Sequence, residues 1–457
     1  MFIRFFTASS KPSRWEARSL LVSGFLLAGL SFASPVWAAA PEGSYRGHAY
    51  GTFASADAGP IAATLGRSAF LPCGCRGTDG RILRNRIDSL SAGPNGRVLR
   101  LDAILTTAFT DELANEAVVR TTARVEGLNM FNGLIKANVI KAHANVSATT
   151  ADIDTDSDGT HFVGLRVAGQ VIDDNVAPNT KLELPGLGSV TINKITKAGG
   201  GRLITVEALV VKVELENDFD LPIGVEIIVA HAKAGFSRSV PEVVFGGQAY
   251  AVEANARIGE GLANRIGKAA AIYLGCEGTA GKTKSNNIAD LGVGKILSLG
   301  TGRTTAFGGT TPSGKVAKTT AKVEDVSLLN GAVSADAVTA VAQETIKNGI
   351  KTRSTQGSRF VGLRVNGLLM PVDTPPNTVI QLPLFGRVII NEQTIPPAGS
   401  NDPTAVRGLV IIITKPNVLN LPVGSRIIVA HARAKALFFE DEPIESADEL
   451  NLAEKTN

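Results

Sequence analysis

Alternate aspartates fill one short run of the chain, DIDTDSDGT at residues 152–160. Within it, Asp154, Asp156 and Asp158 precede Gly159, which gives the order D-x-D-x-D-G that opens an EF-hand-type loop. In such a loop alternate carboxylates converge on a calcium ion, and the glycine permits the sharp turn. The run therefore predicts calcium held by these three aspartates.

An acidic hairpin loop between two strands is the alternative. The glutamate that closes an EF-hand loop is missing, because Leu165 stands at its position, so a metal would need the backbone carbonyl of Thr160 or the Asp173 and Asp174 carboxylates. A related stretch lies 198 residues later. It keeps the glycine as Gly357 and replaces the aspartates with Thr352, Ser354 and Gln356. Both interpretations stay open.

The three cysteines offer the next candidate chemistry. Cys75 and Cys276 occupy equivalent positions in GCRGTDG and GCEGTAG, and Cys73 is additional. An exported protein normally oxidises its thiols. The alternatives are buried, small apolar residues beside a glycine turn, a Cys73–Cys75 pair closing a small strained ring, or a Cys75–Cys276 bridge joining two repeated regions. Equivalent positions in tandem domains are often far apart, which weighs against the last.

Two histidines recur, His231 and His431, each within IIVAHA. No acidic or nucleophilic partner recurs with them, so we interpret them as strand residues. The sequence contains no G-x-S-x-G, H-E-x-x-H or paired-cysteine zinc pattern. No catalytic residue is therefore assigned, and the chain is predicted not to be an enzyme.

A long internal repeat organises these residues. TTARVEG at Thr121 returns as TTAKVED at Thr319, and FVGLRVAG at Phe162 returns as FVGLRVNG at Phe360, both 198 residues later. A period of this length predicts a tandem domain duplication rather than a solenoid. We place the two copies at residues 45–237 and 245–437.

Each copy is predicted to be all-β. The runs are short, rich in β-branched residues and separated by turn signals such as GLGS, APNT and PPAGS. The segments TDELANEAV and AVSADAVTAVAQETI could be helical, and we favour a strand for the second. The expected architecture is two tandem antiparallel domains, each sandwich-like or a partly closed barrel.

The first 38 residues read as a signal peptide. Basic residues precede the apolar run LLVSGFLLAGLSFA, and Val36 and Ala38 suit a cleavage site after Ala38. This segment has a net charge of +3, so the formal +4 of the whole chain falls to about +1 and gives no support for nucleic-acid binding. No later stretch is long and apolar enough to predict a second membrane span. Residues 438–457 form an acidic, polar tail.

Several motifs together resemble the bacterial choice-of-anchor P family. They are GHAYG, TTARVEGLNMFNGLIKANVIKA, GLRVAGQ, PNTKLELPGLGSVTIN, ITVEALVVKV and IIVAHA, and the resemblance covers both copies. It implies a secreted, surface-associated protein with a β-rich region, and it implies no known reaction. The C-terminal anchor typical of that family is not recognisable in residues 438–457.

The predicted function is that of an exported, non-catalytic surface or extracellular-matrix protein with a structural or adhesive role, stabilised by calcium in its first domain. Its partners would be other surface proteins, further copies of itself or an extracellular polymer. A carbohydrate- or polymer-binding module is one alternative, but Trp15 and Trp37, the two tryptophans, both lie in the signal segment. A hydrolase is the other, and it lacks an acid–base constellation.

Overall fold

The computed structural model describes residues 40–54, 67–87, 89–93, 96–113, 115–255 and 265–442. The predicted signal peptide (1–38) and most of the predicted acidic tail (443–457) lie outside the described residues. We refer to residues 40–237 as the first half and residues 243–442 as the second half.

The described residues form four antiparallel sheets and contain no α-helix, which confirms the predicted all-β class. Their helical elements are two 3-10 turns, η3 (Phe131–Gly133) and η4 (Phe439–Asp441). AVSADAVTAVAQETI lies in a strand, as favoured from its sequence. Across the described residues no helix has the length and apolar character to cross a membrane.

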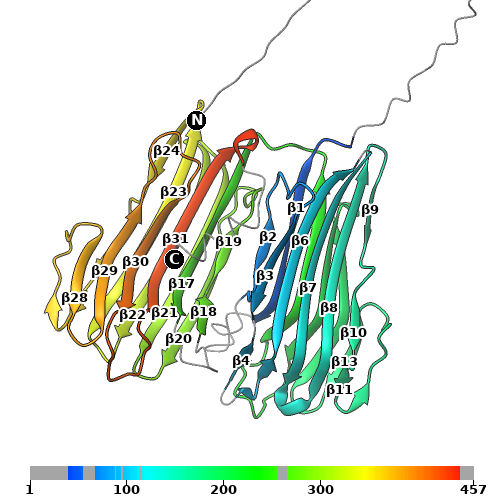
Figure 1. Ribbon diagram of the computed structural model, residues 1–457, viewed down its shortest axis with the longest axis horizontal. Helices are drawn as coiled ribbons and strands as arrows, with labels where there is room; N and C mark the ends of the chain where they lie inside the picture. The colour runs from blue at the N-terminus through cyan, green and yellow to red at the C-terminus, as the bar shows by residue number, and fades with distance from the viewer. Residues whose placement is uncertain are drawn as a thin grey trace, which may run out of the picture. The chain divides into compact units, whose positions relative to one another are not determined.

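The first half contains two of the sheets (Figure 1). Sheet 1 has the order β13-β14-β15-β16-β1-β2 and sheet 2 has the path β12-β11-β8-β7-β5-β4. In sheet 2, β9 and β10 also pair with β8, and β6 joins β3 to β7. The bounds in sheet 1 are β1 (Ser44–Ala54), β2 (Leu71–Cys73), β13 (Thr180–Leu184), β14 (Gly188–Ala198), β15 (Leu203–Val213) and β16 (Glu226–Ser237). Those in sheet 2 are β3 (Ile82–Ile87), β4 (Leu90–Ala92), β5 (Leu99–Leu101), β6 (Ala103–Leu113), β7 (Glu116–Met130), β8 (Ile135–Thr149), β9 (Ile153–Asp156), β10 (His161–Val163), β11 (Arg166–Val167) and β12 (Gln170–Val171).

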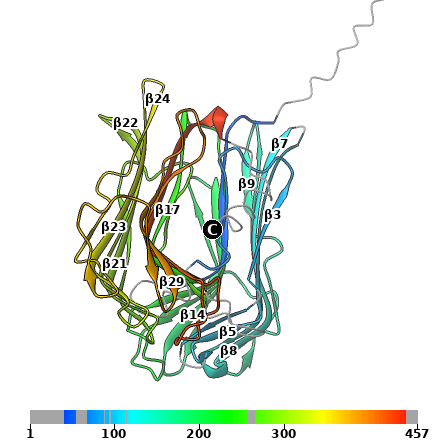
Figure 2. The same ribbon diagram turned by 60° about the vertical axis from the view of Figure 1, so that its left-hand side comes forward.

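The second half contains the other two sheets, whose layers Figure 2 shows from the side. Sheet 3 has the order β18-β17-β31-β30-β29-β28, with β19 also on β17. Sheet 4 has the order β20-β21-β22-β23-β26-β27, with β24 and β25 also on β23. The bounds in sheet 3 are β17 (Val243–Asn255), β18 (Arg265–Ala269), β19 (Ile272–Leu274), β28 (Thr378–Leu382), β29 (Gly386–Thr394), β30 (Thr404–Ile413) and β31 (Arg426–Phe438). Those in sheet 4 are β20 (Lys284–Val293), β21 (Leu297–Thr311), β22 (Gly314–Leu328), β23 (Val333–Lys347), β24 (Ile350–Ser354), β25 (Arg359–Val361), β26 (Arg364–Val365) and β27 (Leu368–Leu369).

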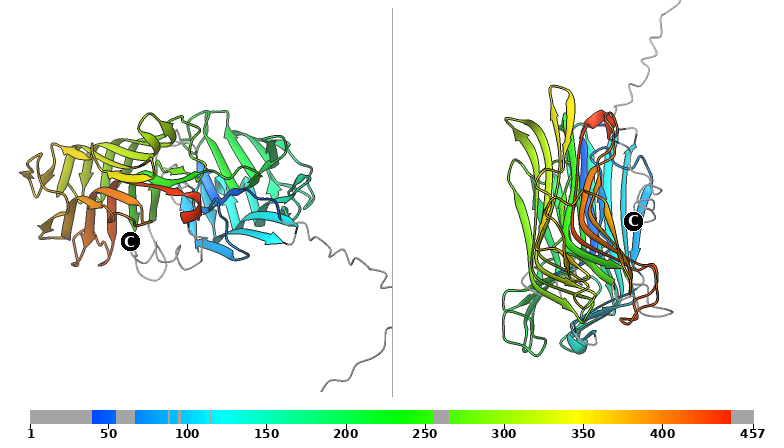
Figure 3. Two further views of the ribbon diagram at one scale, coloured as in Figure 1. Left: turned by 90° about the horizontal axis from the view of Figure 1, so that it is seen from above. Right: turned by 90° about the vertical axis from the view of Figure 1, so that its left-hand side faces the viewer.

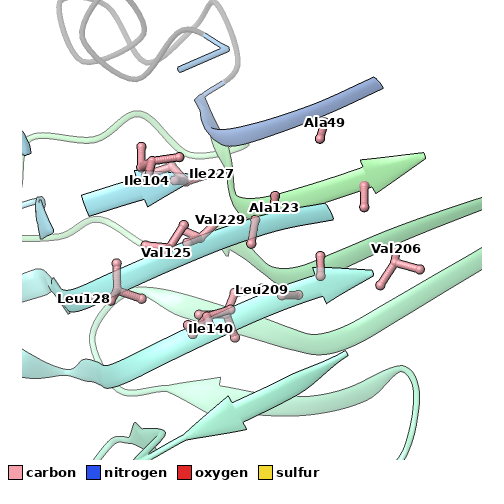
Figure 4. Close-up of a cluster of buried hydrophobic side chains, with 14 of the residues drawn as sticks. Ala49, Ile104, Ala123, Val125, Leu128, Ile140, Val206, Leu209, Ile227 and Val229 are labelled. Atoms are coloured by element: carbon pink, nitrogen blue, oxygen red, sulfur yellow. The ribbon is translucent and has the colours of Figure 1, made fainter. Parts of the chain in front are cut away.

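The two sheets of each half lie as two layers (Figure 3), and both contribute to the large apolar core of that half. In the first half, Ile140 of β8 and Val125 of β7 lie in the same cluster as Leu209 of β15 and Val229 of β16 (Figure 4). Alternation along each strand sends one set of side chains into this layer and the other set outward. The apolar and polar periodicity of the sequence therefore becomes the inner and outer faces of the sheets.

The second half differs from the first in one buried charge. Glu344 of β23 is fully buried, and its carboxylate accepts hydrogen bonds from the Thr404 backbone N–H at 3.0 Å and the Ala436 backbone N–H at 2.9 Å. Arg353 Nε and Lys351 Nζ lie 3.4 and 3.7 Å from the carboxylate. This carboxylate joins sheet 4 to β30 and β31 of sheet 3.

Replacing Glu344 with Ala is expected to lower the free energy of unfolding by about 3–5 kcal/mol, because the Arg353 and Lys351 cations would lose their buried counter-charge. Chemical denaturation followed by circular dichroism measures this loss. An unchanged denaturation midpoint would contradict it.

The first half provides the control for this variant. Val146, Ile153 and Thr155 stand at the positions that correspond to Glu344, Lys351 and Arg353. The combined variant Glu344→Val, Lys351→Ile, Arg353→Thr removes every charge of the cluster together, so it is expected to be clearly more stable than Glu344→Val alone.

Candidate functional site: a disulfide-linked contact between the two halves

The two equivalent cysteines lie in matching β-turns. The Gly77 N–H donates to the Gly74 carbonyl at 3.1 Å, and the Gly278 N–H donates to the Gly275 carbonyl at 2.9 Å, so Cys75 and Cys276 each follow the first residue of a turn. Gly77 and Gly278 have φ of 79° and 76°, a conformation that favours glycine. The local sequence G-C-x-G therefore fixes where each thiol points.

Cys75 and Cys276 form a disulfide that links the two halves across 201 residues, with their Cα atoms 5.8 Å apart. The bond lies in a small apolar cluster in which Cys75, Val244 and Leu437 are buried and Phe439 packs against them. Cys73 lies instead at the end of β2, buried in the core of the first half. Of the three arrangements that the sequence left open, the structure contains the bridge between the repeated regions.

The sequence did not predict that the two turns lie against each other, because their approach depends on the contacts around them. The Tyr45 N–H donates to the Cys75 carbonyl and the Phe245 N–H donates to the Cys276 carbonyl, each at 2.9 Å. Each turn is thereby held to the first strand of its own half, β1 or β17. The disulfide thus joins two elements that are already fixed within their sheets.

Arg76, the residue after Cys75, binds the end of the second half. Its Nη1 donates to the Glu440 and Glu442 carbonyls at 2.7 and 2.9 Å, and its backbone N–H donates to Glu442 Oε2 at 3.1 Å. Burial raises the pKa of Glu442, and backbone donors from Arg76 and Cys75 oppose that rise. These residues were not singled out in the sequence, where no local motif marks them.

Further contacts between the halves are polar and aromatic. Arg46 forms an ion pair with Glu277, and both side chains are more than one-third exposed, so its contribution is small. The rings of Phe70 and Tyr273 stack with centroids 4.0 Å apart. The Arg67 guanidinium lies 5.7 Å from each of these two ring centroids. This cation–π cluster extends the contact beyond the disulfide.

The recurring histidines stack on the recurring tyrosines. His231 lies 4.2 Å from Tyr50 and His431 lies 4.5 Å from Tyr250, centroid to centroid, and both histidines are buried. His231 Nδ1 lies 3.3 Å from Glu207 Oε1. Burial lowers the pKa of both histidines, most strongly for His431, and Arg407 lowers the pKa of His431 further.

These depressed pKa values predict a loss of stability in acid. An unfolded histidine titrates near 6.5 and the buried ring below that, so the unfolded chain binds more protons once the pH falls through 6.5. Below pH 6.5 the free energy of unfolding is therefore expected to fall with pH. His431→Phe, which keeps a ring against Tyr250, is expected to reduce the slope of unfolding free energy against pH by up to about 1.4 kcal/mol per pH unit. Denaturation between pH 7.5 and 5 measures the slope. The same change at the exposed His161 is the control, and an equal effect there would contradict the assignment.

The acidic run lies at a strand end. Asp154 and Asp156 lie in β9, and Asp158 lies in the turn closed by the Thr160 N–H and the Ser157 carbonyl at 3.0 Å. Asp156 accepts hydrogen bonds from Asn145 Nδ2 at 2.7 Å and from the Asp158 N–H at 3.0 Å. In the described part of the chain, no three or more His, Cys, Asp or Glu side chains are grouped to hold a metal ion. The calcium site stays a prediction.

Cys276→Ser is expected to abolish the link between the Cys75 and Cys276 peptides, and Cys73→Ala is expected to leave it intact. Loop-closure entropy for a link across 201 residues predicts a loss of unfolding free energy of up to about 5 kcal/mol for Cys276→Ser. Peptide mapping without reductant, together with denaturation curves, measures both effects. A Cys73-containing cross-link in the unsubstituted protein would contradict the assignment.

Comparisons with known proteins do not place the chain in a family. No protein-family model and no curated protein matches it. The structure described as "The Structure of Intact Ap-TbpB (N and C lobes)" is similar at 7% identity and a TM-score of 0.11, covering 87% of this chain and 79% of that chain. Similarity at this level carries no argument about fold or function. The resemblance to the choice-of-anchor P family stays a prediction.

Proposed function

We propose that this protein is an exported, non-catalytic surface or extracellular-matrix protein with a structural or adhesive role. The observation that carries the proposal is the Cys75–Cys276 disulfide. Such bonds persist in oxidising, extracytoplasmic environments, and this one is consistent with that location. A signal peptide at residues 1–38 would deliver the chain there.

The proposal includes an origin by internal duplication, giving two β-sandwich domains at residues 45–237 and 245–437. A pair with exchanged charges supports it. Lys194 Nζ lies 2.9 Å from Glu207 Oε2 across β14 and β15, whereas Arg407 Nη1 lies 2.7 Å from Glu392 Oε2 across β29 and β30. The two residues of the pair have exchanged sign together, as expected when cross-strand neighbours must stay complementary.

A structural role fits how the two domains meet. The disulfide, the Arg76 contacts with residues 440 and 442 and the Phe70–Tyr273 stack all join one domain to the other. A two-domain protein held at a covalent joint can transmit force between partners without unfolding at the joint. The resemblance to the choice-of-anchor P family, with its surface-associated members, points the same way.

Export and adhesion can be tested separately. The full chain and a chain starting at Ala39 are each expressed in a bacterium and followed by cell fractionation. The full chain is expected outside the cytoplasm with Cys75–Cys276 oxidised, and the shortened chain is expected inside with both thiols reduced. A full chain retained in the cytoplasm would overturn the export proposal.

Adhesion is tested with the purified chain of residues 39–457. It is expected to sediment with isolated cell envelopes or to self-associate, and the Cys276→Ser variant is expected to withstand less shear in the bound state. Failure to bind envelopes, extracellular polymer or itself would remove the adhesive role and leave the export result intact.

A further inference from the structure

The outer face of sheet 3, opposite the core, carries an excess of positive charge. Val388, Leu409 and Val429 lie in the core, and alternation along the strands turns Arg387 and Arg426 outward. The paired register skips Asn391, Gly408 and Ala430, and this irregularity turns Arg407 and Arg433 to the same outer face. We call this surface the basic face. Its cations are Lys268, Arg387, Arg407, Arg426, Arg433 and Lys435, and its carboxylates are Glu253 and Glu392.

At the centre of the basic face, the Glu392 carboxylate forms ion pairs with two arginines, Arg407 and Arg426. Glu392 Oε2 lies 2.7 Å from Arg407 Nη1 and 3.6 Å from Arg426 Nη2, and Arg426 Nε is buried without a hydrogen bond. Burial lowers the pKa of Arg426 and the Arg407 charge lowers it further, whereas Glu392, Tyr250 and Glu253 oppose this shift. Arg387 is exposed and has no acidic partner among the described residues. Among the described residues of the basic face, six cations therefore stand beside two carboxylates.

His431 is buried among the cations of the basic face. It is 3% exposed, and neither ring nitrogen has a hydrogen bond. Its pKa is lowered by burial and then by Arg407, Lys268, Arg433 and Arg426. The four charged groups with the largest effect on this ring are cations.

The first half lacks this arrangement. Ser189, Glu207 and Glu226 stand where the second half has Arg387, Arg407 and Arg426. The apolar centre is common to both halves, as Tyr50, Val210 and Ile228 in one and Tyr250, Val410 and Ile428 in the other. The apolar residues therefore belong to the shared fold, and the arginines are specific to the second half.

The chain that follows the described structure has the complementary charge. Residues 443–457 contain Glu445, Asp448, Glu449 and Glu454 with a single Lys455, and Ile444, Leu450 and Leu452 lie among them. Asn401 Nδ2 donates to the Asp441 carbonyl at 3.3 Å, so the chain leaves the described structure beside the β29–β30 loop, at one end of the basic face.

Residues 443–457, the tail, are also long enough to extend along the whole of β31. Its 15 residues span up to about 50 Å when extended, and the distance along β31 from Phe438 back to Arg426 is about 40 Å. We propose that residues 443–457 dock on the basic face of sheet 3, where their carboxylates pair with Arg387 and Arg426. The basic face is thus a site for an acidic polypeptide, filled by the chain's own C-terminus.

Carbodiimide cross-linking of the chain of residues 39–457 tests this. An isopeptide bond is expected between a tail carboxylate and Lys268, the lysine beside Tyr250 on the basic face. The bond should disappear in Lys268→Arg, which keeps the charge but not the amine. Arg387→Ser with Arg426→Glu, which installs the residues of the first half, should reduce its yield at least about tenfold.

A matched variant of sheet 1 serves as the control. A mixture of isotope-labelled and unlabelled chains distinguishes cross-links within one chain from cross-links between two chains. Lys181→Ser with Lys212→Glu removes the same charge from the outer face of sheet 1 and should leave the yield unchanged. Arg387→Ser alone should lower the yield if the double variant fails to fold. Three results would each overturn the proposal. They are absence of the Lys268 cross-link, equal linkage of the tail to Lys181 and Lys212 in the unsubstituted protein, and cross-links that join labelled to unlabelled chains.

Discussion

The Cys75–Cys276 disulfide is the constraint on which the contact between the two halves depends. An ion pair as exposed as Arg46–Glu277 contributes roughly 0–1 kcal/mol, and an aromatic pair such as Phe70–Tyr273 contributes about 0.5–1.5 kcal/mol beyond its buried area. Closing a link across 201 residues is worth up to about 5 kcal/mol in loop entropy. The covalent bond therefore outweighs each of these two contacts.

A comparison of corresponding positions in the two halves shows which residue types the backbone requires and which can differ. Gly77 and Gly278 both have positive φ, and a Cβ at either would collide with β6 or β21. The interior tolerates more, since Val146 and Glu344 occupy corresponding buried positions with opposite polarity. On the outer faces, Ser189, Glu207 and Glu226 of the first half correspond to Arg387, Arg407 and Arg426 of the second, so the two outer faces differ in charge.

Much of the fold followed from sequence pattern. Short β-branched runs between turn signals predicted an all-β chain, and the strand over Val333–Lys347 was correctly preferred to a helix. Both depend on local periodicity, which a sequence shows directly. The two turns meet through packing between residues far apart in the chain, and no local pattern encodes that contact.

Other features had a signal that could have found them. Aligning the repeat places Glu344 opposite Val146 on an inward-facing position, and it places Glu392 and Arg407 opposite Lys194 and Glu207. A charge at an apolar position and a paired reversal of sign are both visible in one sequence once the repeat is aligned. Arg76 and Glu442 have no such signal, because their contact arises only where the halves meet.

The most direct test of the disulfide-linked joint is to cut the chain between Ser237 and Val243. A protease site inserted there, cleaved to completion, should leave one species of full mass under denaturing, non-reducing conditions and two fragments after reduction. Separation of the fragments without a reductant would show that the two halves are not covalently joined, and it would contradict the account.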